Sequence, residues 1–204
     1  MTDQPRYYRM QRRAESQADT HRRITESAVE LHGTVGPART SMSAVAAHAG
    51  VRRSTLYRHF ADEAALFDAC SAHWAAANPV PDLDSWAAIV DVDERLTAGL
   101  GELYGFYGRT ETMLSNLIRD KDIVPSVRER FGALDGYFEL ARDSLLVGRK
   151  LRGAAKVRTQ AAIGHAIAFS TWRSLVQEQG LDDAIAVRLM GLLVAAAQQG
   201  PRAK

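Results

Sequence analysis

The stretch AGVRRSTLYRHFADEAAL, from Ala49 to Leu66, carries three arginines, a tyrosine and a histidine around an apolar pair, Leu56 and Phe60. Side chains four residues apart lie on one face of a helix, so this pair predicts the buried face of a short helix. The other side chains then face away from the core. A solvated surface helix and a helix that lies on DNA both fit this pattern.

The residues before this helix predict a second short helix that meets it at a tight turn. Ser41 can cap its start. Its buried face follows the spacing i, i+3, i+4, i+7 at Met42, Val45, Ala46 and Ala49. Gly50 follows, where a residue in the left-handed conformation would end the helix. Two short helices joined in this way indicate a helix-turn-helix motif.

The third helix, which we expect to start near Arg53 or Ser54, leaves polar side chains on its open faces. Arginine can bind the N7 and O6 atoms of guanine in the major groove, and Ser or Thr can bond phosphates or base edges. The hydroxyl of Tyr57 suits a phosphate oxygen, and the free N–H groups near Ser41 could bind another phosphate. The open side chains are Arg53, Ser54, Thr55, Tyr57, Arg58 and His59.

The charge distribution agrees with a polyanionic partner for this region. Residues 1–60 hold ten Arg against five Asp and Glu, a net of +5, while the other 144 residues have a net of −3. The basic N-terminal region beside a slightly acidic remainder suggests that this region binds a polyanion, although a solubilising basic tail would give the same count.

The segment TSMSAVAAHAGVRRSTLYRHFADEAALF resembles the DNA-binding region of the tetracycline-repressor (TetR) family of bacterial transcription regulators. The resemblance covers about residues 20–70. Four positions depart from the family pattern. His32 replaces an aromatic core residue and Pro37 stands where an aromatic residue is common. Arg52 replaces a serine, and Glu63 stands where a phosphate-binding lysine is common. The resemblance, with the chemistry above, gives these DNA-binding candidates: Thr40, Ser41, Arg52, Arg53, Ser54, Thr55, Tyr57, Arg58 and His59.

We expect an all-α chain of about nine helices, because no alternating run of β-branched residues marks a strand. A flexible basic tail (1–18) precedes a helix-turn-helix DNA-binding domain (19–78). The stretch NPVPD then breaks the helical pattern. A helical-bundle ligand-binding and dimerisation domain (82–204) follows, with helices expected at about 85–108, 111–119, from 125, 155–179 and 183–198. The tail is either loose or, as in homeodomain arms, inserted into a minor groove.

The body contains residues suited to a ligand pocket, which the resemblance also implies. Ligand cavities are typically lined by aromatic side chains with a few polar groups among them. An uncharged or weakly polar aromatic inducer would suit a cavity lined by the candidates below. Each of these residues alone could also belong to an ordinary hydrophobic core. Gly101, Gly105 and Gly108 share a helix face and allow either a ligand or a close helix crossing. The candidates are Tyr104, Tyr107, Met113, Asn116, Leu117, Phe138, His165, Phe169 and Trp172.

The last two expected helices suggest a dimer interface. The final helix, AIAVRLMGLLVAAA, is apolar around much of its circumference, so we expect two of its sides to be buried against other helices. Either a two-fold four-helix interface or a buried hairpin in a monomer would provide it. The resemblance implies a dimer that binds a palindromic operator, acts as a repressor, and releases DNA when an inducer binds.

Other classes of protein find little support in the sequence. The single cysteine, Cys70, cannot form an internal disulfide, and there is neither an apolar run of eighteen residues nor a signal-peptide core, so we expect a cytoplasmic protein with no membrane span. The motifs H-E-x-x-H, G-x-S-x-G and Walker A are missing. We therefore expect no enzyme, cofactor or metal site; a helical interaction module or an enzyme that has lost operator binding is the alternative.

Overall fold

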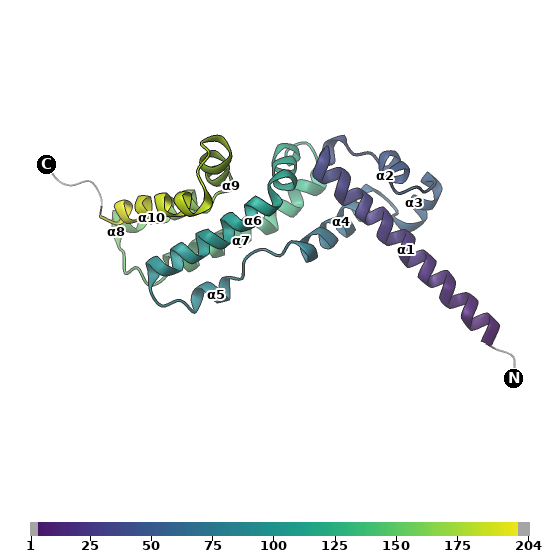
Figure 1. Cartoon of the computed structure of the whole chain (residues 1–204), viewed down its shortest axis with the longest axis horizontal. Helices are drawn as coiled ribbons and strands as arrows, with labels where there is room; N and C mark the ends of the chain where they lie inside the picture. Colours follow the sequence, from purple (N-terminus) through teal and green to yellow (C-terminus); the bar gives the residue numbers. More distant parts are fainter. Residues whose placement is uncertain (1–3, 200–204) are drawn as a thin grey trace. The chain divides into compact units, whose positions relative to one another are not determined.

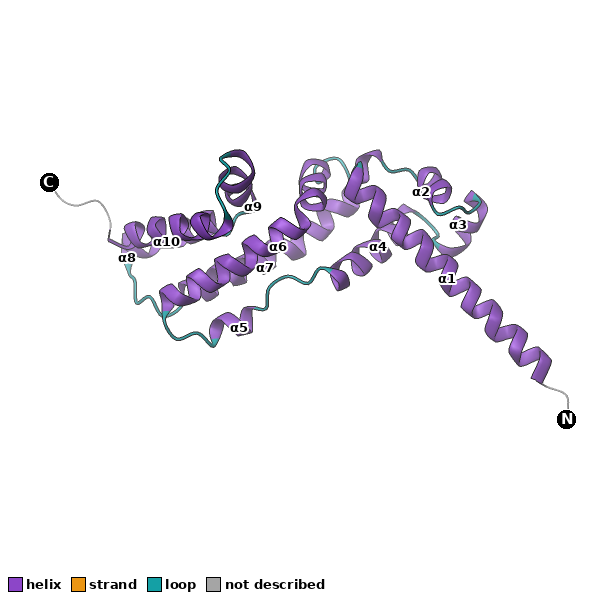
Figure 2. Ribbon diagram, in the orientation of Figure 1, coloured by secondary structure: helices purple, strands orange, loops and turns teal. Residues whose placement is uncertain are grey.

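The computed structural model describes residues 4–199, and within that range every regular element is a helix (Figure 1, Figure 2). The all-α prediction is confirmed, with ten α-helices and two short helical segments in the described range where about nine helices were expected. The chain divides into two compact units. Unit 1 contains residues 1–79 and 112–129, and unit 2 contains residues 80–111 and 130–204.

Unit 1 contains the predicted helix-turn-helix. Its elements are α1 (Gln4–Thr34), the 3-10 turn η1 (Pro37–Arg39), α2 (Met42–His48), α3 (Arg53–His59) and α4 (Glu63–Ala77), with the end of α6 and the start of α7. Helix α1 packs against α2 and α4, and α2 packs against α3. The core between them holds fully or nearly fully buried apolar side chains, among them Ile24, Ala28, Val45, Leu56, Phe60, Leu66 and Phe67.

The first helix starts earlier than the sequence pattern suggested. Residues 4–18, predicted to belong to a flexible tail, form the first turns of α1. No Gly or Pro interrupts the chain between Pro5 and Gly33, and proline is tolerated in the first turn of a helix. Polar residues without an apolar period can continue a helix that is already formed, because propagation is easier than nucleation.

Unit 2 consists of α5 (Leu83–Ala87), most of α6 (Val92–Asp120), most of α7 (Pro125–Leu146), α8 (Gly153–Ala166), α9 (Phe169–Trp172), the π-helical segment η2 (Arg173–Glu178) and α10 (Asp183–Gln199). The helix expected at 85–108 is divided, because α5 ends at Ala87 and α6 begins at Val92. The α6 helix then continues to Asp120 without the break that was expected before residue 111. The single helix expected at 155–179 is divided after Ala166.

The core of unit 2 forms around α6. Trp86, Leu100, Leu103, Leu145 and Ile163 are almost fully buried there. Gly99 lies where helices approach closely, since a Cβ atom at this position would come within 3.1 Å of Leu145 and 3.2 Å of Trp86. No helix among residues 4–199 is both long and apolar enough to cross a lipid bilayer.

Candidate nucleic-acid interface

Capping interactions fix both ends of α2. The Ser41 hydroxyl accepts a hydrogen bond from the Ala44 N–H at 3.1 Å, which confirms the predicted N-cap. At the other end Gly50 has φ +65°, in the left-handed region. The Gly50 N–H donates to Ala47 and the Val51 N–H donates to Ala46, at 3.1 and 2.9 Å, the bond pattern of a Schellman motif. This turn sets the direction in which α3 leaves α2.

Helix α1 holds the turn in place. The Arg23 guanidinium donates to the Ala49 carbonyl at 2.5 Å, a contact between residues 26 positions apart. A carbonyl at a helix C-terminus has no partner within the helix, and a cationic donor satisfies it well. The tight turn therefore depends on α1 as well as on Gly50.

Helix α3 buries one face and exposes the rest. Leu56 and Phe60 are buried, as predicted from their spacing. The side chains of Arg52, Arg53, Ser54, Tyr57 and Arg58 are exposed, and those of Thr55 and His59 are half-buried. Arg52 stands at the N-cap position and makes no side-chain capping bond, as expected for a side chain that cannot accept one. The helix thus presents a row of cations and hydroxyls away from its core.

Two of the exposed side chains interact with each other. An Arg53 Nη donates to the Tyr57 hydroxyl at 3.3 Å, and the guanidinium carbon lies 5.5 Å from the centre of the tyrosine ring. A cation stacked on an aromatic ring has fewer side-chain conformations to lose on binding. Arg53 is therefore partly positioned before any partner arrives.

His59, at the end of α3, meets α1. Its ring lies 6.1 Å from that of His21. Its Nε2 atom is buried and has no hydrogen-bond partner among the described atoms. Partial burial, then the neighbouring Arg58 and His21, lower the pKa of His59. We therefore do not include His59 among the cations proposed to bind DNA.

Thr40 is not on the exposed surface. Its side chain is buried and its hydroxyl donates to the Gly36 carbonyl at 2.8 Å. The interpretation of Thr40 as a DNA contact is corrected by this position, because a hydroxyl committed inside the fold cannot also meet a phosphate. Thr40 instead stabilises the link from η1 to Ser41.

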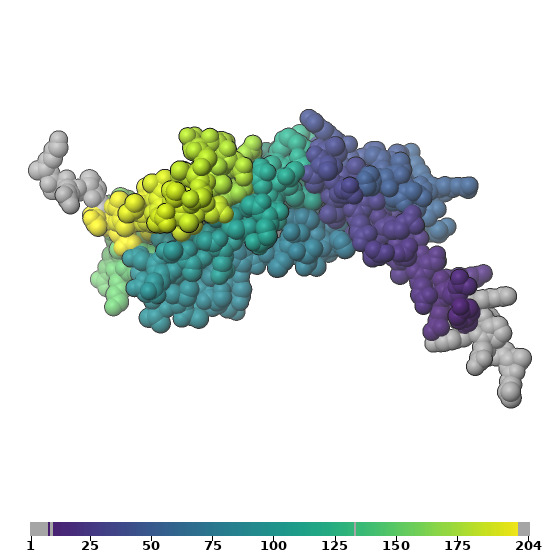
Figure 3. Space-filling model, viewed as in Figure 1, coloured from purple at the N-terminus to yellow at the C-terminus, as the bar shows by residue number. Residues whose placement is uncertain are grey.

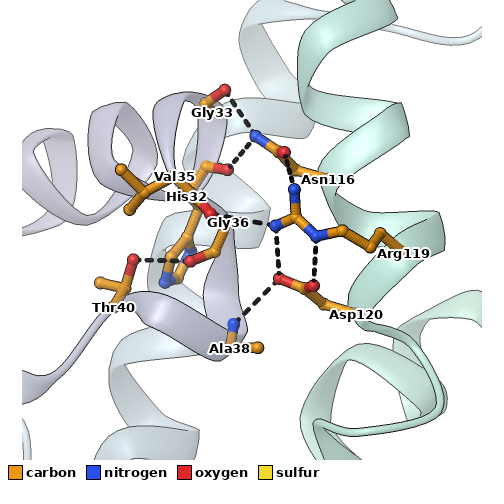
Figure 4. Close-up of polar contacts among 9 residues, drawn as sticks. All are labelled: His32, Gly33, Val35, Gly36, Ala38, Thr40, Asn116, Arg119 and Asp120. Carbon is orange, nitrogen blue, oxygen red and sulfur yellow. Dashed lines mark hydrogen bonds and ion pairs between the residues drawn. The ribbon is translucent and has the colours of Figure 1, made fainter.

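A polar cluster from the end of α6 holds the end of α1 (Figure 4). The Asn116 side-chain amide donates to the carbonyls of His32 and Gly33 at 3.1 and 2.7 Å. Arg119 donates to the Val35 carbonyl at 3.0 Å and to the Asn116 side-chain oxygen at 2.8 Å. These are the carbonyls that a helix C-terminus leaves without partners, so α6 acts as the C-cap of α1.

Asp120 completes this cluster. Its side chain is almost fully buried, accepts the Ala38 N–H at 3.0 Å, and pairs with Arg119 at 2.8 and 3.0 Å. The Arg119 hydrogen bond is the main cause that holds the pKa of Asp120 below its usual value. Gly36 leaves room for the pair, since a Cβ atom there would collide with Arg119 and Asp120. The cluster positions η1 and, through it, the start of α2.

A second buried pair lies beneath the helix-turn-helix. The Cys70 Sγ lies 3.5 Å from His32 Nδ1, and the His32 ring packs 5.6 Å from that of Phe67. Burial lowers the pKa of His32 to about 4 and raises the pKa of the Cys70 thiol to about 12. A buried neutral thiol is a poor nucleophile, so Cys70 contributes packing to this core.

The lowered pKa of His32 predicts that acid destabilises the protein. The unfolded chain takes up a proton at His32 near pH 6.5, whereas the folded chain does so only near pH 4. The free energy of unfolding is therefore unaffected by His32 above pH 6.5 and decreases as the pH falls from 6.5 towards 4. At pH 5 it should be lower by about 2 kcal/mol. His32→Phe keeps the packing and removes the titrating group, so its free energy of unfolding should fall less. Urea denaturation of both proteins at pH 7.5 and pH 5 measures this; equal losses would contradict a titrating His32.

The predicted ligand-binding residues fall in both units. Met113, Asn116 and Leu117 belong to unit 1, and the other six belong to unit 2. Asn116 is occupied in capping α1, which corrects its interpretation as a pocket wall. The contacts of Asn116 and Asp120 with the end of α1 and with η1 could not be predicted from the sequence, because the residues that they join lie more than 80 positions apart and no local pattern marks such a contact.

Five of the other candidates form an aromatic cluster in unit 2: Tyr104, Tyr107, Phe138, Phe169 and Trp172. The Tyr104 and Tyr107 hydroxyls donate to the carbonyls of Ala166 and Ile167 at 2.9 and 2.5 Å. These contacts satisfy the unpaired carbonyls at the end of α8. His165 is exposed, with a ring nitrogen 3.3 Å from the Thr171 hydroxyl.

Gly101 and Gly108 are exposed at the surface of α6 and face open space. A Cβ atom at Gly101 would meet no atom within 4 Å, and one at Gly108 would meet only Trp172, at 3.8 Å. These glycines therefore do not mark a close helix crossing. A cavity of about 470 Å³ also opens in unit 2 between α7 and α8, lined by Arg142, Asp143, Leu146, Val147, Lys150, Leu151, Lys156 and Gln160.

Comparison with known families identifies the helix-turn-helix region. Residues 24–70, from the middle of α1 to Cys70, match the family described as "Bacterial regulatory proteins, tetR family". This range contains both short helices and the Gly50 turn. No curated protein sequence matches the chain.

Solved structures of similar fold extend the likeness over most of the chain. A Clostridium perfringens protein, named as a candidate regulator of fatty acid metabolism, is 14% identical with a TM-score of 0.61; the match covers 84% of this chain and 96% of that one. NalD, the secondary repressor of the MexAB-OprM multidrug efflux pump in Pseudomonas aeruginosa, is 17% identical with a TM-score of 0.56 over 88% and 96%. The multidrug binding protein EbrR, solved with imidazole, is 21% identical with a TM-score of 0.50 over 84% and 88%.

Proposed function

We propose that this chain, a member of the tetR family of bacterial regulatory proteins, is a transcriptional repressor that binds a palindromic operator as a homodimer and releases it when a small molecule binds. One observation carries the DNA-binding part: α3 buries Leu56 and Phe60 and exposes a cationic, hydroxyl-rich face. Such a face suits the major groove, where arginine discriminates guanine from the other bases. A protein with this role would work in the bacterial cytoplasm, where the chromosome lies.

The DNA contacts divide by chemistry into two groups. Arg53, held against Tyr57, is proposed to read base edges, with Arg52 and Ser54 beside it. Tyr57, Arg58 and Ser41 are proposed to bind phosphates, and half-buried Thr55 is proposed to approach a base or the backbone. Phosphate contacts position a protein on the duplex and base contacts give it sequence preference.

A homodimer through α8 and α10 is supported by an uncovered apolar face. Ala186, Val187, Met190 and Val194 bury one side of α10, where it packs against α8. The opposite side exposes large apolar side chains at the spacing i, i+4, i+7, i+8: Ile185, Leu189, Leu192 and Leu193. An apolar helix face exposed along its length is typical of an interface, and a two-fold dimer would match the symmetry of a palindrome.

The dimer proposal predicts that Leu192→Glu will yield monomers. Leu192 is 69% exposed, so a carboxylate there leaves the fold of a single chain intact but would be buried without a partner in the dimer. The dimer dissociation constant should rise by about 100-fold, measured by sedimentation equilibrium. Leu140→Glu, at a site on α7 that is 64% exposed, is the matched control and should leave the dimer unchanged. A dimeric Leu192→Glu protein would rule out this interface.

The inducer is proposed to bind in unit 2, beside the aromatic cluster of Tyr104, Tyr107, Phe138, Phe169 and Trp172. The proposal is supported by the contacts that bring these five aromatic rings together within one unit. A weakly polar aromatic molecule would match the lining, and the multidrug-binding and efflux-repressing neighbours are in keeping with such a ligand. By linkage, the inducer weakens DNA binding by the same factor by which DNA weakens inducer binding.

Selection from a pool of random duplexes tests the function as a whole. The pool is incubated with the full-length protein, and bound DNA is recovered and amplified over several rounds. The proposal expects enrichment of an inverted repeat whose half-sites lie about one helical turn apart, or a multiple of it. Enrichment of no sequence would overturn the regulatory function and favour a helical interaction module.

A further inference from the structure

We propose that the N-terminal part of α1, residues 4–19, is a second DNA-binding element that grips phosphates beside α3; this rests on the DNA-reading function proposed above. We refer to these residues as the α1 arm. The arm is continuous with the helix that packs against the helix-turn-helix, but it extends beyond that packing. Figures 1 and 3 show it leaving the rest of unit 1 as a free helix at the N-terminal end.

The end of α3 marks where the arm begins. His21 of α1 contacts the rings of His59 and Phe60, with ring centres 6.1 and 4.5 Å apart. Before His21, Tyr8 and every residue from Met10 to Asp19 are exposed. A helix rises 1.5 Å per residue, so Arg13 stands about 12 Å beyond His21. That length is about the width of the major groove, so a protein with α3 in the groove carries Arg13 to its edge, where phosphates lie.

The direction of the arm also favours this contact. Arg13 and Ile24 are eleven residues apart, which is about three helical turns, so they lie on the same face of α1. Ile24 is fully buried beneath the helices of unit 1. Arg13 therefore continues the side of α1 that carries the helix-turn-helix.

The positive charge of the arm favours a polyanionic partner. The arm contains Arg6, Arg9, Arg12 and Arg13 against two acids, Glu15 and Asp19. Asp19 is already paired with Arg22 at 2.6 Å. Arg12 lies 5.8 Å from the Tyr8 ring and Arg13 is exposed; neither has an ion pair with a described residue. The cations of α3 lie in the same unit, so a second copy would meet like charge, whereas the phosphates of one duplex would satisfy both groups.

The stability of the arm points to a partner as well. A helix of about fifteen residues with no packed face is marginal in water. Among the arm residues whose side chains the structure describes, the large apolar ones that are exposed are Tyr8 and Met10, and these do not form an apolar stripe along the helix. Phosphate binding by its arginines would supply the missing stabilisation. We therefore expect DNA binding to stabilise the helical conformation of the arm.

The test compares two variants on the duplex enriched by selection and on a scrambled duplex of equal length. Arg12→Ala with Arg13→Ala removes two proposed phosphate contacts and keeps the helix, since alanine is the best helix former. Arg22→Ala is the matched control, because Arg22 lies on the same helix but is occupied by Asp19 and Glu26. Dissociation constants are measured by fluorescence anisotropy across a range of salt concentrations.

The slope of log affinity against log salt should fall by about 1.8 in the double variant, since each phosphate contact contributes about 0.9. Affinity for both duplexes should fall by about tenfold at physiological salt, because phosphates carry no sequence information. Arg22→Ala should match the parent, and Arg12→Lys with Arg13→Lys should restore the slope. If the double variant has the same slope as the parent, the proposal for the arm is wrong, while the DNA-binding function proposed for α3 is unaffected. A parent that binds neither duplex would overturn the DNA-reading function and the arm with it.

Discussion

Replacing Asp120 with alanine is expected to lower the free energy of unfolding of unit 1 by about 1 to 3 kcal/mol, the range found when a hydrogen-bond donor in the fold loses its acceptor. The Asp120 side chain is 3% exposed and accepts hydrogen bonds from Arg119 and from the Ala38 N–H. Its loss leaves that N–H without its acceptor, whereas Arg119 loses its ion pair but keeps its bonds to Val35 and Asn116. The link between α1 and α2 then loses one of its two anchors to α6.

The chain contains a matched control for this prediction. Arg142 and Asp143 are also neighbours on a helix and form an ion pair, at 3.2 Å, but the Asp143 side chain is 61% exposed. Exposed pairs contribute about 0 to 1 kcal/mol, so Asp143→Ala should leave stability nearly unchanged. Chemical denaturation followed by helical circular dichroism measures both variants. Equal, small losses would mean that the polar cluster does not hold α1 in place.

Arg53→Ala is expected to reduce binding to the selected duplex by about 5- to 150-fold, which corresponds to the roughly 1–3 kcal/mol that a good arginine–guanine pair contributes. Binding to a scrambled duplex should change little, because a base contact contributes only where its base is present. The specificity ratio therefore falls. Arg173→Ala, an exposed arginine in unit 2, is the control and should bind both duplexes as the parent does.

Tyr57→Phe should behave differently. Loss of the hydroxyl removes a phosphate contact and weakens binding to both duplexes by a similar factor, with the specificity ratio retained. Arg53 keeps its ring partner in this variant, since the phenylalanine ring still offers its face to the guanidinium. Competition anisotropy with both duplexes separates the two variants. If both bind as tightly and as selectively as the parent, α3 is not the recognition helix.

The helix-turn-helix could be predicted from the sequence because its determinants are local. Ser41 and Asp62 sit at N-caps, Gly50 forms the left-handed turn, and the i, i+4 spacing of Leu56 and Phe60 marks the face of α3 that is buried. Each signal acts within a few residues of its effect. The all-α fold followed from the same kind of pattern along the chain.

The rest depended on contacts between distant residues or on continuity between helices. Nothing near Asn116 or Asp120 indicates that they bind α1 and η1, more than 80 positions earlier. Thr40 matched the resemblance as a DNA contact, but its hydroxyl is committed to Gly36. The polar residues before Asp19 lack an apolar period, which favoured a loose tail, whereas the structure continues α1 through them. A break was expected between residues 108 and 111, whereas α6 runs through this point.

The central claim is that α3 reads a specific DNA sequence, and the most direct measurement is the ratio of two dissociation constants. Fluorescence anisotropy at fixed, near-physiological salt gives the affinity of the full-length protein for the selected duplex and for a scrambled duplex of the same length and composition. The account predicts that the selected duplex binds at least about a thousandfold more tightly, the lower end of the range for specific regulators. Equal binding to the two duplexes would contradict it.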